Sequence, residues 1–474
     1  MVTISILANA GGVGGSAMTI SLILLTYKFD PHSCVALTQV FTFAGTSTAT
    51  ILKLKDRHPT CDKPLIYYDV LMQIVSPILI GVSIGVLLNP SFPGWLILTI
   101  LTVIIFLLGW DTLKRIIALY KKEKRQTQVE TEPDNARVQA SGFSNTNFDS
   151  RDSVVKRDSD VEGVKIGEIK KTEEENDEKN DEEVNDENNQ EGFKENGDSV
   201  KIDNIEKSVE DNDNLNSPQQ LLGSKEIDPE LMRKLTTIYQ EDKKIIAWVP
   251  LLYFLVLVSV SITYSLIKGS STSKSIIGIK SCSSSYFSIA SAYYIFMFLM
   301  SILAAFYLVR KSKILEAANH NFGEGEIKWN YKKCLKVEIF SILSGIILGL
   351  LGLGGGNLIG PMLLSMGVRP EVSTISTSFS IALSSGVAAA MYFITGVVDY
   401  QYAAWFYLLS VVGCLVGVLV VRRIAIRKQR VSSLIFCQFV ILFVSFIIIP
   451  IVGTLNAIKQ SDEGTFQIGF KSFC

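Results

Sequence analysis

The sequence has little of the chemistry that enzymes and metalloproteins use. Its 474 residues include three histidines and seven cysteines, and no CxxC or Cys/His pair has metal-ligand spacing. The apolar runs contain neither paired carboxylates nor a Ser/His dyad of the kind that acid–base or nucleophilic catalysis needs. The sequence therefore predicts no metal and no cofactor, and an intramembrane enzyme ranks last among the candidate functions.

The formal net charge of −1 hides an uneven distribution of charged residues. Residues 161–220 hold 20 Asp and Glu against 7 Lys and Arg, so the rest of the chain carries a positive excess. That excess lies in short loops beside apolar runs, and nothing in it indicates a nucleic-acid partner.

Long apolar runs dominate the rest of the chain. Hydrophobic residues make up 48% of it, and the mean hydropathy is +0.31. Several runs exceed the ~18 residues that indicate a membrane-spanning helix. The predicted spans are 33–52, 66–88, 94–119, 245–267, 286–310, 372–395, 402–421 and 432–456, with glycine-interrupted apolar stretches at 2–27 and 337–366. We expect an all-α, multi-pass membrane protein; the sequence does not distinguish a plasma membrane from an endomembrane.

Residues 121–243 differ completely in composition. They are rich in Glu, Asp, Asn and Lys and nearly free of aromatics, so they cannot bury enough apolar surface to offset their chain entropy. We expect a disordered cytoplasmic linker with a short helix near Pro229–Tyr239. The predicted organisation is a first membrane repeat (1–120), this linker (121–243), two linking spans (244–310), a basic loop (311–336), a second membrane repeat (337–457) and a C-terminal tail (458–474).

The second interrupted stretch contains the sequence Gly352-Leu-Gly-Gly-Gly356. Each glycine costs ~1 kcal/mol relative to alanine inside a helix, so the run should break the helix. A break inside a bilayer leaves backbone N–H and C=O groups unpaired, which is tolerated only within protein or along a wet cavity. The run therefore predicts a binding site.

The glycine run has a counterpart near the N-terminus, and further matches follow in order. They are Gly12-Val-Gly-Gly-Ser16 with Gly352–Gly356 at an offset of 340, Leu24–Thr26 with Leu363–Ser365, Pro31 with Pro370 and Thr38 with Thr377 at 339, and Gly81-x-x-x-Gly85 with Gly413-x-x-x-Gly417. These matches predict two repeats of a broken helix plus three spans. The glycine pair at 81 and 85 also suits close helix packing.

Lys and Arg concentrate in the loops at 53–63, 114–125, 310–336 and 422–430, which the positive-inside rule places in the cytoplasm. This placement inverts the second repeat relative to the first if each broken stretch is a re-entrant hairpin that enters and leaves on one side. Inverted repeats with broken helices are typical of transporters. The alternative counts each broken stretch as one crossing.

A helix that restarts after the glycine run presents unpaired N–H groups and the positive end of its dipole, which favours an anion. Glycine also lets the anion approach the backbone, because no Cβ intervenes. The candidate residues are Gly352, Gly354, Gly355, Gly356, Asn357, Ser376, Thr377 and Ser378, with Thr38 from the other repeat. In the alternative, small residues permit a tight helix crossing and the hydroxyls bond back to helix carbonyls.

Charged residues are few within the predicted spans. Since a proton-coupled transporter often buries a carboxylate, Asp111 is the candidate coupling carboxylate. In the alternative, Asp111 lies at the membrane interface and pairs with Lys114 or Arg115. Glu338 opens the second interrupted stretch.

The stretches GGVGGS (11–16) and GLGGGNLIGPMLLSMGVRP (352–370) resemble the paired signature of the TauE/SafE family of sulfite and sulfonate exporters. Residues 57–69, with Pro77, Gly81, Gly85 and Asn89, are similar to its eukaryotic, plant-type branch. The similarity covers roughly 5–120 and 245–455. It implies a multi-span exporter of small sulfur-containing anions, coupled to an ion gradient. By matching position it implies the site residues Gly12, Gly14, Gly15, Gly352, Gly354, Gly355, Gly356 and Pro361.

Two residues depart from this resemblance. Ser16 stands where the first signature usually continues with glycine, and Ser21 stands near an expected proline. Residues 1–10 lack the basic n-region of a signal peptide and resemble the end of a longer first helix. We therefore expect the first repeat to bind more weakly than the second, or only to support it.

The expected function is export of small sulfite- or sulfonate-like anions across a lipid bilayer. The alternative is a membrane scaffold or receptor that acts through a cytoplasmic partner of the acidic linker. The substrate, the coupling ion and the oligomeric state stay open.

Overall fold

The computed structural model describes residues 2–3, 5–6, 15–27, 29–58, 63–114, 116–117, 229–244, 247–269, 275, 277–279, 283–320, 325–421, 431–462 and 469–470. They form helices, turns and one isolated β-bridge between Arg57 and Pro64. The chain divides into two units, Met1–Gln128 with Ser217–Cys474, and Val129–Asn216. All described residues belong to the first unit, so most of the predicted linker lies outside them.

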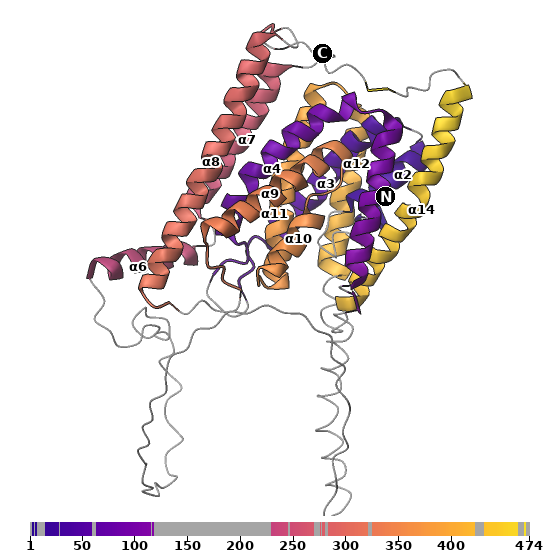
Figure 1. Cartoon of the computed structure of the whole chain (residues 1–474). Helices are drawn as coiled ribbons and strands as arrows, with labels where there is room; N and C mark the ends of the chain where they lie inside the picture. Colours follow the sequence, from indigo (N-terminus) through magenta and orange to yellow (C-terminus); the bar gives the residue numbers. More distant parts are fainter. Residues whose placement is uncertain are drawn as a thin grey trace, which may run out of the picture. The chain divides into compact units, whose positions relative to one another are not determined.

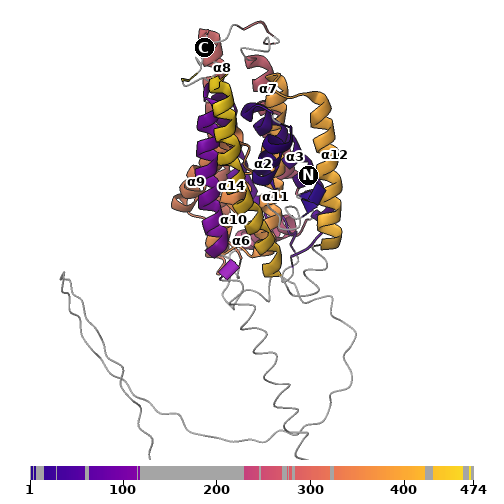
Figure 2. The same ribbon diagram turned by 90° about the vertical axis from the view of Figure 1, so that its right-hand side faces the viewer.

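Nine of the described helices are long and apolar enough to cross a membrane, so the protein is an all-α, multi-pass membrane protein. The helices (Figures 1 and 2) are α2 Ser16–Tyr27, α3 Pro31–Lys53, α4 Tyr68–Leu88 with the 3₁₀ turn η1 Asn89–Ser91, an unlabelled helix Gly94–Lys114, α6 Pro229–Lys243, α7 Trp248–Lys268, α8 Ser284–Ala317, α9 Tyr331–Leu351, α10 Gly356–Ser365, α11 Pro370–Ile394, α12 Tyr400–Val416 with the π-turn η2 Gly417–Val421, and α14 Val431–Asp462. Each predicted span corresponds to one of them.

The connection between α8 and α9 is shorter than the predicted basic loop 311–336. α8 continues to Ala317 and α9 begins at Tyr331, so only residues 318–330 join them. Charged residues can extend a helix beyond its apolar part, because water and side chains satisfy the helix ends there.

The two halves of the chain place a short helix before a long one in the same way. α2 and α10 have 12 and 10 residues, too few to cross a bilayer. The long helices α3 and α11 follow, each with a proline, Pro31 or Pro370, at its start. Proline suits that position because the first N–H of a helix has no partner within the helix.

α3 and α11 begin at opposite ends of α4. His32 Nδ1, in the first turn of α3, lies 3.1 Å from Asn89 Oδ1, just after α4. The Tyr67 N–H, just before α4, donates to Ser376 Oγ of α11 at 2.9 Å. α3 and α11 therefore start at opposite ends of a helix that is long enough to cross a membrane.

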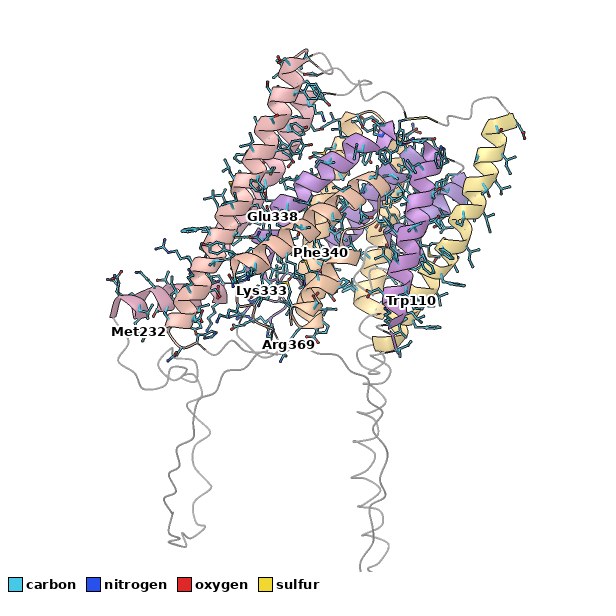
Figure 3. The ribbon with its side chains drawn as sticks, in the orientation of Figure 1. Trp110, Met232, Lys333, Glu338, Phe340 and Arg369 are labelled. Carbon is cyan, nitrogen blue, oxygen red and sulfur yellow. The ribbon has the colours of Figure 1, made fainter. Side chains whose placement is uncertain are left out.

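The chain from α9 to α10 starts and finishes at the same end of α4. Ahead of α9, the Ile327 N–H donates to Tyr67 Oη at 3.2 Å. In the same loop, a Cβ on Gly325 would lie 3.5 Å from Cγ of Arg369, the residue before α11. Figure 3 shows Lys333 and Arg369 toward that end of the bundle. The glycine run is thus the tip of a hairpin.

α4 and α9 run parallel and touch backbone to backbone. A Cβ on Gly81 would lie 2.8 Å from Gly345 Cα, and a Cβ on Gly85 would lie 2.9 Å from Gly349 Cα. Real Cβ atoms essentially never come this close to backbone, so only glycine permits the contact. The predicted packing role of the glycine pair on α4 fits this geometry.

A matching contact joins α12 to the N-terminal residues. A Cβ on Gly413 would lie 2.9 Å from Val2 O, just as a Cβ on Gly81 would meet Ile342 O. The offset of 340 that relates the two glycine runs also relates Val2 to Ile342. The second glycine of each pair continues the pattern one helical turn later.

α6 is held by ion pairs at the end of the bundle where α4 begins. Lys311 Nζ of α8 lies 2.8 Å from Asp69 of α4 and 2.6 Å from Asp242 of α6. Lys63 Nζ lies 2.6 Å from Glu326 in the loop before α9. This cluster joins the α3–α4 loop, the α8–α9 loop and the last helix of the predicted linker, beside α7 and α8 (Figure 1).

Candidate functional site

The tip of the α9–α10 hairpin touches helices of the first predicted repeat. Gly352 ends α9 with a φ of +73°, the left-handed conformation that favours glycine. A Cβ on Gly352 would lie 3.2 Å from Ile20 of α2 and 3.3 Å from Val35 of α3. The Gly354 N–H donates to Ser16 Oγ, at the start of α2, at 2.6 Å. The two predicted repeats therefore meet at the glycine run.

Side chains from three different elements cap the last carbonyls of α9. A helix end leaves its final C=O groups without intrahelical partners, and inside a membrane other protein groups must supply them. The three bonds are Gln39 Nε2 of α3 to Leu348 O (2.5 Å), Tyr392 Oη of α11 to Gly349 O (2.6 Å) and Asn89 Nδ2 of η1 to Leu350 O (2.8 Å). The negative end of the α9 dipole is thus satisfied by neutral donors.

The N–H groups at the start of α10 are less fully paired than the carbonyls at the end of α9. Gly355 and Gly356 are buried, and within the described part of the chain their N–H groups have no hydrogen-bond acceptor. The amides of Leu358 and Ile359 already bond to Gly355 O at 3.2 Å. The break therefore offers N–H donors at the positive end of a helix, a geometry that suits an anion.

Thr377 of α11 lies beside the first turns of α10, with its methyl group toward Gly356 and its hydroxyl toward Gly360. A Cβ on Gly356 would lie 2.7 Å from Thr377 Cγ2, and a Cβ on Gly360 would lie 4.0 Å from Thr377 Oγ1. Thr377 Oγ1 is buried and has no partner among the described residues. The three other predicted hydroxyls are engaged: Ser376 accepts from Tyr67 N–H, Ser378 donates to Thr374 O and Thr38 donates to Cys34 O. For Ser378 and Thr38 the structure matches the alternative in which hydroxyls bond back to their own helix.

For the described ones among the remaining predicted site residues, the structure gives the backbone position but no contact at the break. Gly15 precedes α2 with a φ of +66°, and Pro361 lies inside α10. Asn357 belongs to α10 by its backbone, but its side chain lies outside the described part, as do Gly12 and Gly14 entirely.

Asp111, the predicted coupling carboxylate, is exposed in the last turn of its helix, next to Trp110 (Figure 3). This position matches the interfacial alternative. The described residues also contain no group of three or more His, Cys, Asp or Glu that could hold a metal ion.

Several residues near the break were not identified from the sequence. Ser344 of α9 donates to Gly355 O at 2.8 Å and so ties the first arm of the hairpin to its tip. Gln39 Oε1, Thr42 Oγ1 and Ser380 Oγ are buried on α3 and α11 without partners among the described residues. The available signal was an amide side chain, that of Gln39, inside a predicted span.

Comparisons with known proteins agree with the membrane architecture. The family model described as "Sulfite exporter TauE/SafE" matches residues 1–144 and 271–446, which is more than half of the chain. The chain is 25% identical over 470 residues to "Sulfite exporter TauE/SafE family protein 1" of Arabidopsis thaliana, covering 99% of this chain and 85% of that protein. It is 24% identical over 466 residues to family protein 3 of the same plant, covering 98% and 79%.

No solved structure matches the chain. The family match spans both predicted repeats and leaves out α6 and α7. The protein is a member of the sulfite exporter TauE/SafE family, a family of membrane transporters.

Proposed function

We propose that the protein is a secondary transporter that exports small sulfur-containing anions and draws on an ion gradient. The observation that carries this proposal is the polarity of the break between α9 and α10. The carbonyls of α9 that would attract a cation are capped, whereas the N–H groups of Gly355 and Gly356 have no acceptor among the described residues. An anion with several oxygen acceptors is the ligand that such a site accepts. The names of the relatives point to sulfite as the first candidate.

The arrangement of the helices supports an inverted repeat built around this site. α3 and α11 start at opposite ends of α4, and each follows a short helix. The Gly354–Ser16 hydrogen bond joins the two broken stretches where they meet. Rocking one repeat against the other would expose the glycine run to the two sides in turn, as in other transporters with inverted repeats.

Counterflow in proteoliposomes tests the proposal. Vesicles preloaded with unlabelled sulfite should take up ³⁵S-sulfite faster than protein-free vesicles, which report passive permeation. Thr377→Val keeps the shape of the side chain but removes a hydroxyl donor worth ~1.4 kcal/mol, so the half-saturating sulfite concentration should rise about tenfold.

Thr374→Val is the matched control on the same helix. The Thr374 hydroxyl is exposed and donates to Pro370 O at 2.7 Å, so this variant should transport like wild type. If wild-type protein moves neither sulfite nor any other oxyanion of a panel, transport is rejected and the scaffold alternative is left.

A further inference from the structure

Glu338 places a carboxylate inside a membrane-spanning helix. Because α9 begins at Tyr331, Glu338 lies in the third turn and not at the start of the span. Its neighbours Leu335, Ile339 and Phe340 are apolar and 59%, 58% and 40% exposed, as expected of a surface that faces lipid. Figure 3 shows Glu338 and Phe340 away from the end of the bundle.

The surroundings of Glu338 contain hydroxyls but no counter-ion. Oε1 of Glu338 is buried and lacks a hydrogen-bond partner among the described residues. Ser301 of α8 lies beside the carboxyl, within reach of a hydrogen bond to it, and Ser341 Oγ is buried without a partner among the described residues. The titratable groups that face it are the Cys334 thiol on α9 and the Tyr253 hydroxyl of α7, which already donates to main-chain carbonyls at 3.3 Å. The described residues supply no Lys, Arg or His to it.

Such a setting suits a carboxylic acid that gains and loses a proton. A charged carboxylate away from water is costly without a cation or several donors. A protonated one is neutral, and its O–H needs only one acceptor, which Ser301 Oγ or Ser341 Oγ can supply.

The polar face of α9 leads from Glu338 to the proposed anion site. Glu338, Ser341 and Ser344 are spaced three residues apart, so each is a neighbour of the next on the helix surface, in a row that winds part of the way around α9. Ser344 Oγ donates to Gly355 O at 2.8 Å, at the tip of the hairpin. A change of charge at Glu338 therefore acts on the same helix that ends at the glycine run.

We propose that Glu338, with the hydroxyls of Ser301 and Ser341, forms the proton-binding site of the transport cycle. The carboxylate takes a proton from water on one side of the membrane and returns it to water on the other. This role replaces the one predicted for the exposed Asp111, and it rests on the proposed transport function.

Proteoliposomes with a pH gradient of one unit separate coupling from anion binding. One coupled proton allows a change in ³⁵S-sulfite accumulation of up to about tenfold per pH unit. In Glu338→Gln we expect the response to the gradient to vanish while counterflow at equal pH persists. Asp111→Asn, the matched control, should respond like wild type. A Glu338→Gln variant that still accumulates sulfite with the gradient would overturn the proposal, and so would a wild type that exchanges sulfite without any response to pH.

Infrared spectroscopy tests the proton site without any transport. The pH-difference spectrum of wild type should contain the C=O band of a protonated carboxyl that Asp111→Asn keeps and Glu338→Gln lacks. Identical spectra for wild type and Glu338→Gln would reject the site. If wild type shows no sulfite flux at all, the proposed function fails, and the infrared result still decides the proton site.

Discussion

The α4–α9 contact and the glycine run both depend on glycine, but they differ in what a side chain would meet. At Gly81 and Gly345 a Cβ would collide with the backbone of the opposite helix. At Gly355 the nearest atom is Ser344 Oγ, at 2.7 Å, which is the end of a side chain that can rotate. The first region is closed because two main chains touch, whereas in the second the atoms nearest to the glycines belong to side chains. Glycine thus serves packing in one place and access to the backbone in the other.

The largest effect on folding is expected from Gly345→Ala. Its methyl group would meet Ile78 O and force α4 and α9 apart, at a cost of roughly 3 kcal/mol. Fluorescence-detected gel filtration after heating should show a large loss of the folded peak. Gly109→Ala is the control, since a Cβ there meets nothing within 4 Å. Equal stability of the two variants would contradict the packing role.

A smaller loss is expected when one cap of the α9 carbonyls is removed. Tyr392→Phe deletes only the hydroxyl that donates to Gly349 O, and an unpaired buried carbonyl costs about 1–3 kcal/mol. Thermal unfolding in detergent should show the loss, whereas Tyr407→Phe, at a half-exposed ring, should not. An unchanged midpoint for Tyr392→Phe would mean that the capped end of the break adds nothing to stability.

The ion-paired loops beside α6 should respond to acid, unlike the two glycine regions. Burial alone would raise the pKa of the Glu326 carboxyl, but His320 and Lys63 outweigh it and lower that pKa to about 2. A lowered pKa in the folded state stabilises the loops above the usual carboxyl pKa near 4.5, and the contribution disappears as pH falls toward 2. Limited proteolysis of the α8–α9 loop across this pH range should show it open in acid, and Glu326→Gln should remove the pH dependence.

The smallest effect on stability, with a large effect on transport, is expected from Gly355→Ala. The backbone of Gly355 has ordinary helical angles, so alanine fits once the Ser344 side chain rotates, which gives up its bond to Gly355 O at a cost of ~1 kcal/mol. The added methyl covers the amide end of α10 and should lower ³⁵S-sulfite counterflow about tenfold or more. The height of the folded peak in gel filtration should stay close to that of wild type. A variant that transports normally would remove the distinction between the two glycine regions.

The sequence predicted the features that depend on local chain chemistry. The helix break at Gly352, the proline starts of α3 and α11 and the spans all follow from residue type and periodicity. The caps by Gln39 and Tyr392 could not be found in this way, because a polar residue in a predicted span does not reveal which distant carbonyl it meets.

The structure adds to two interpretations from the sequence. The first repeat was expected to bind more weakly than the second or only to support it, and the Ser16 hydroxyl, which accepts the Gly354 N–H, fits a supporting role. Glu338 was expected to open the second interrupted stretch, whereas α9 begins two turns earlier, at Tyr331. In each case the deciding partner or boundary depends on packing between segments far apart in sequence.

The central claim is that the amides between α9 and α10 bind an anion. Hydrogen exchange measured by mass spectrometry, with and without sulfite, tests it directly on the wild-type protein. Sulfite should slow exchange in the peptide that contains Gly355 and Gly356, and the protection should weaken in Thr377→Val. Unchanged exchange in that peptide, at sulfite concentrations that saturate counterflow, would contradict the claim.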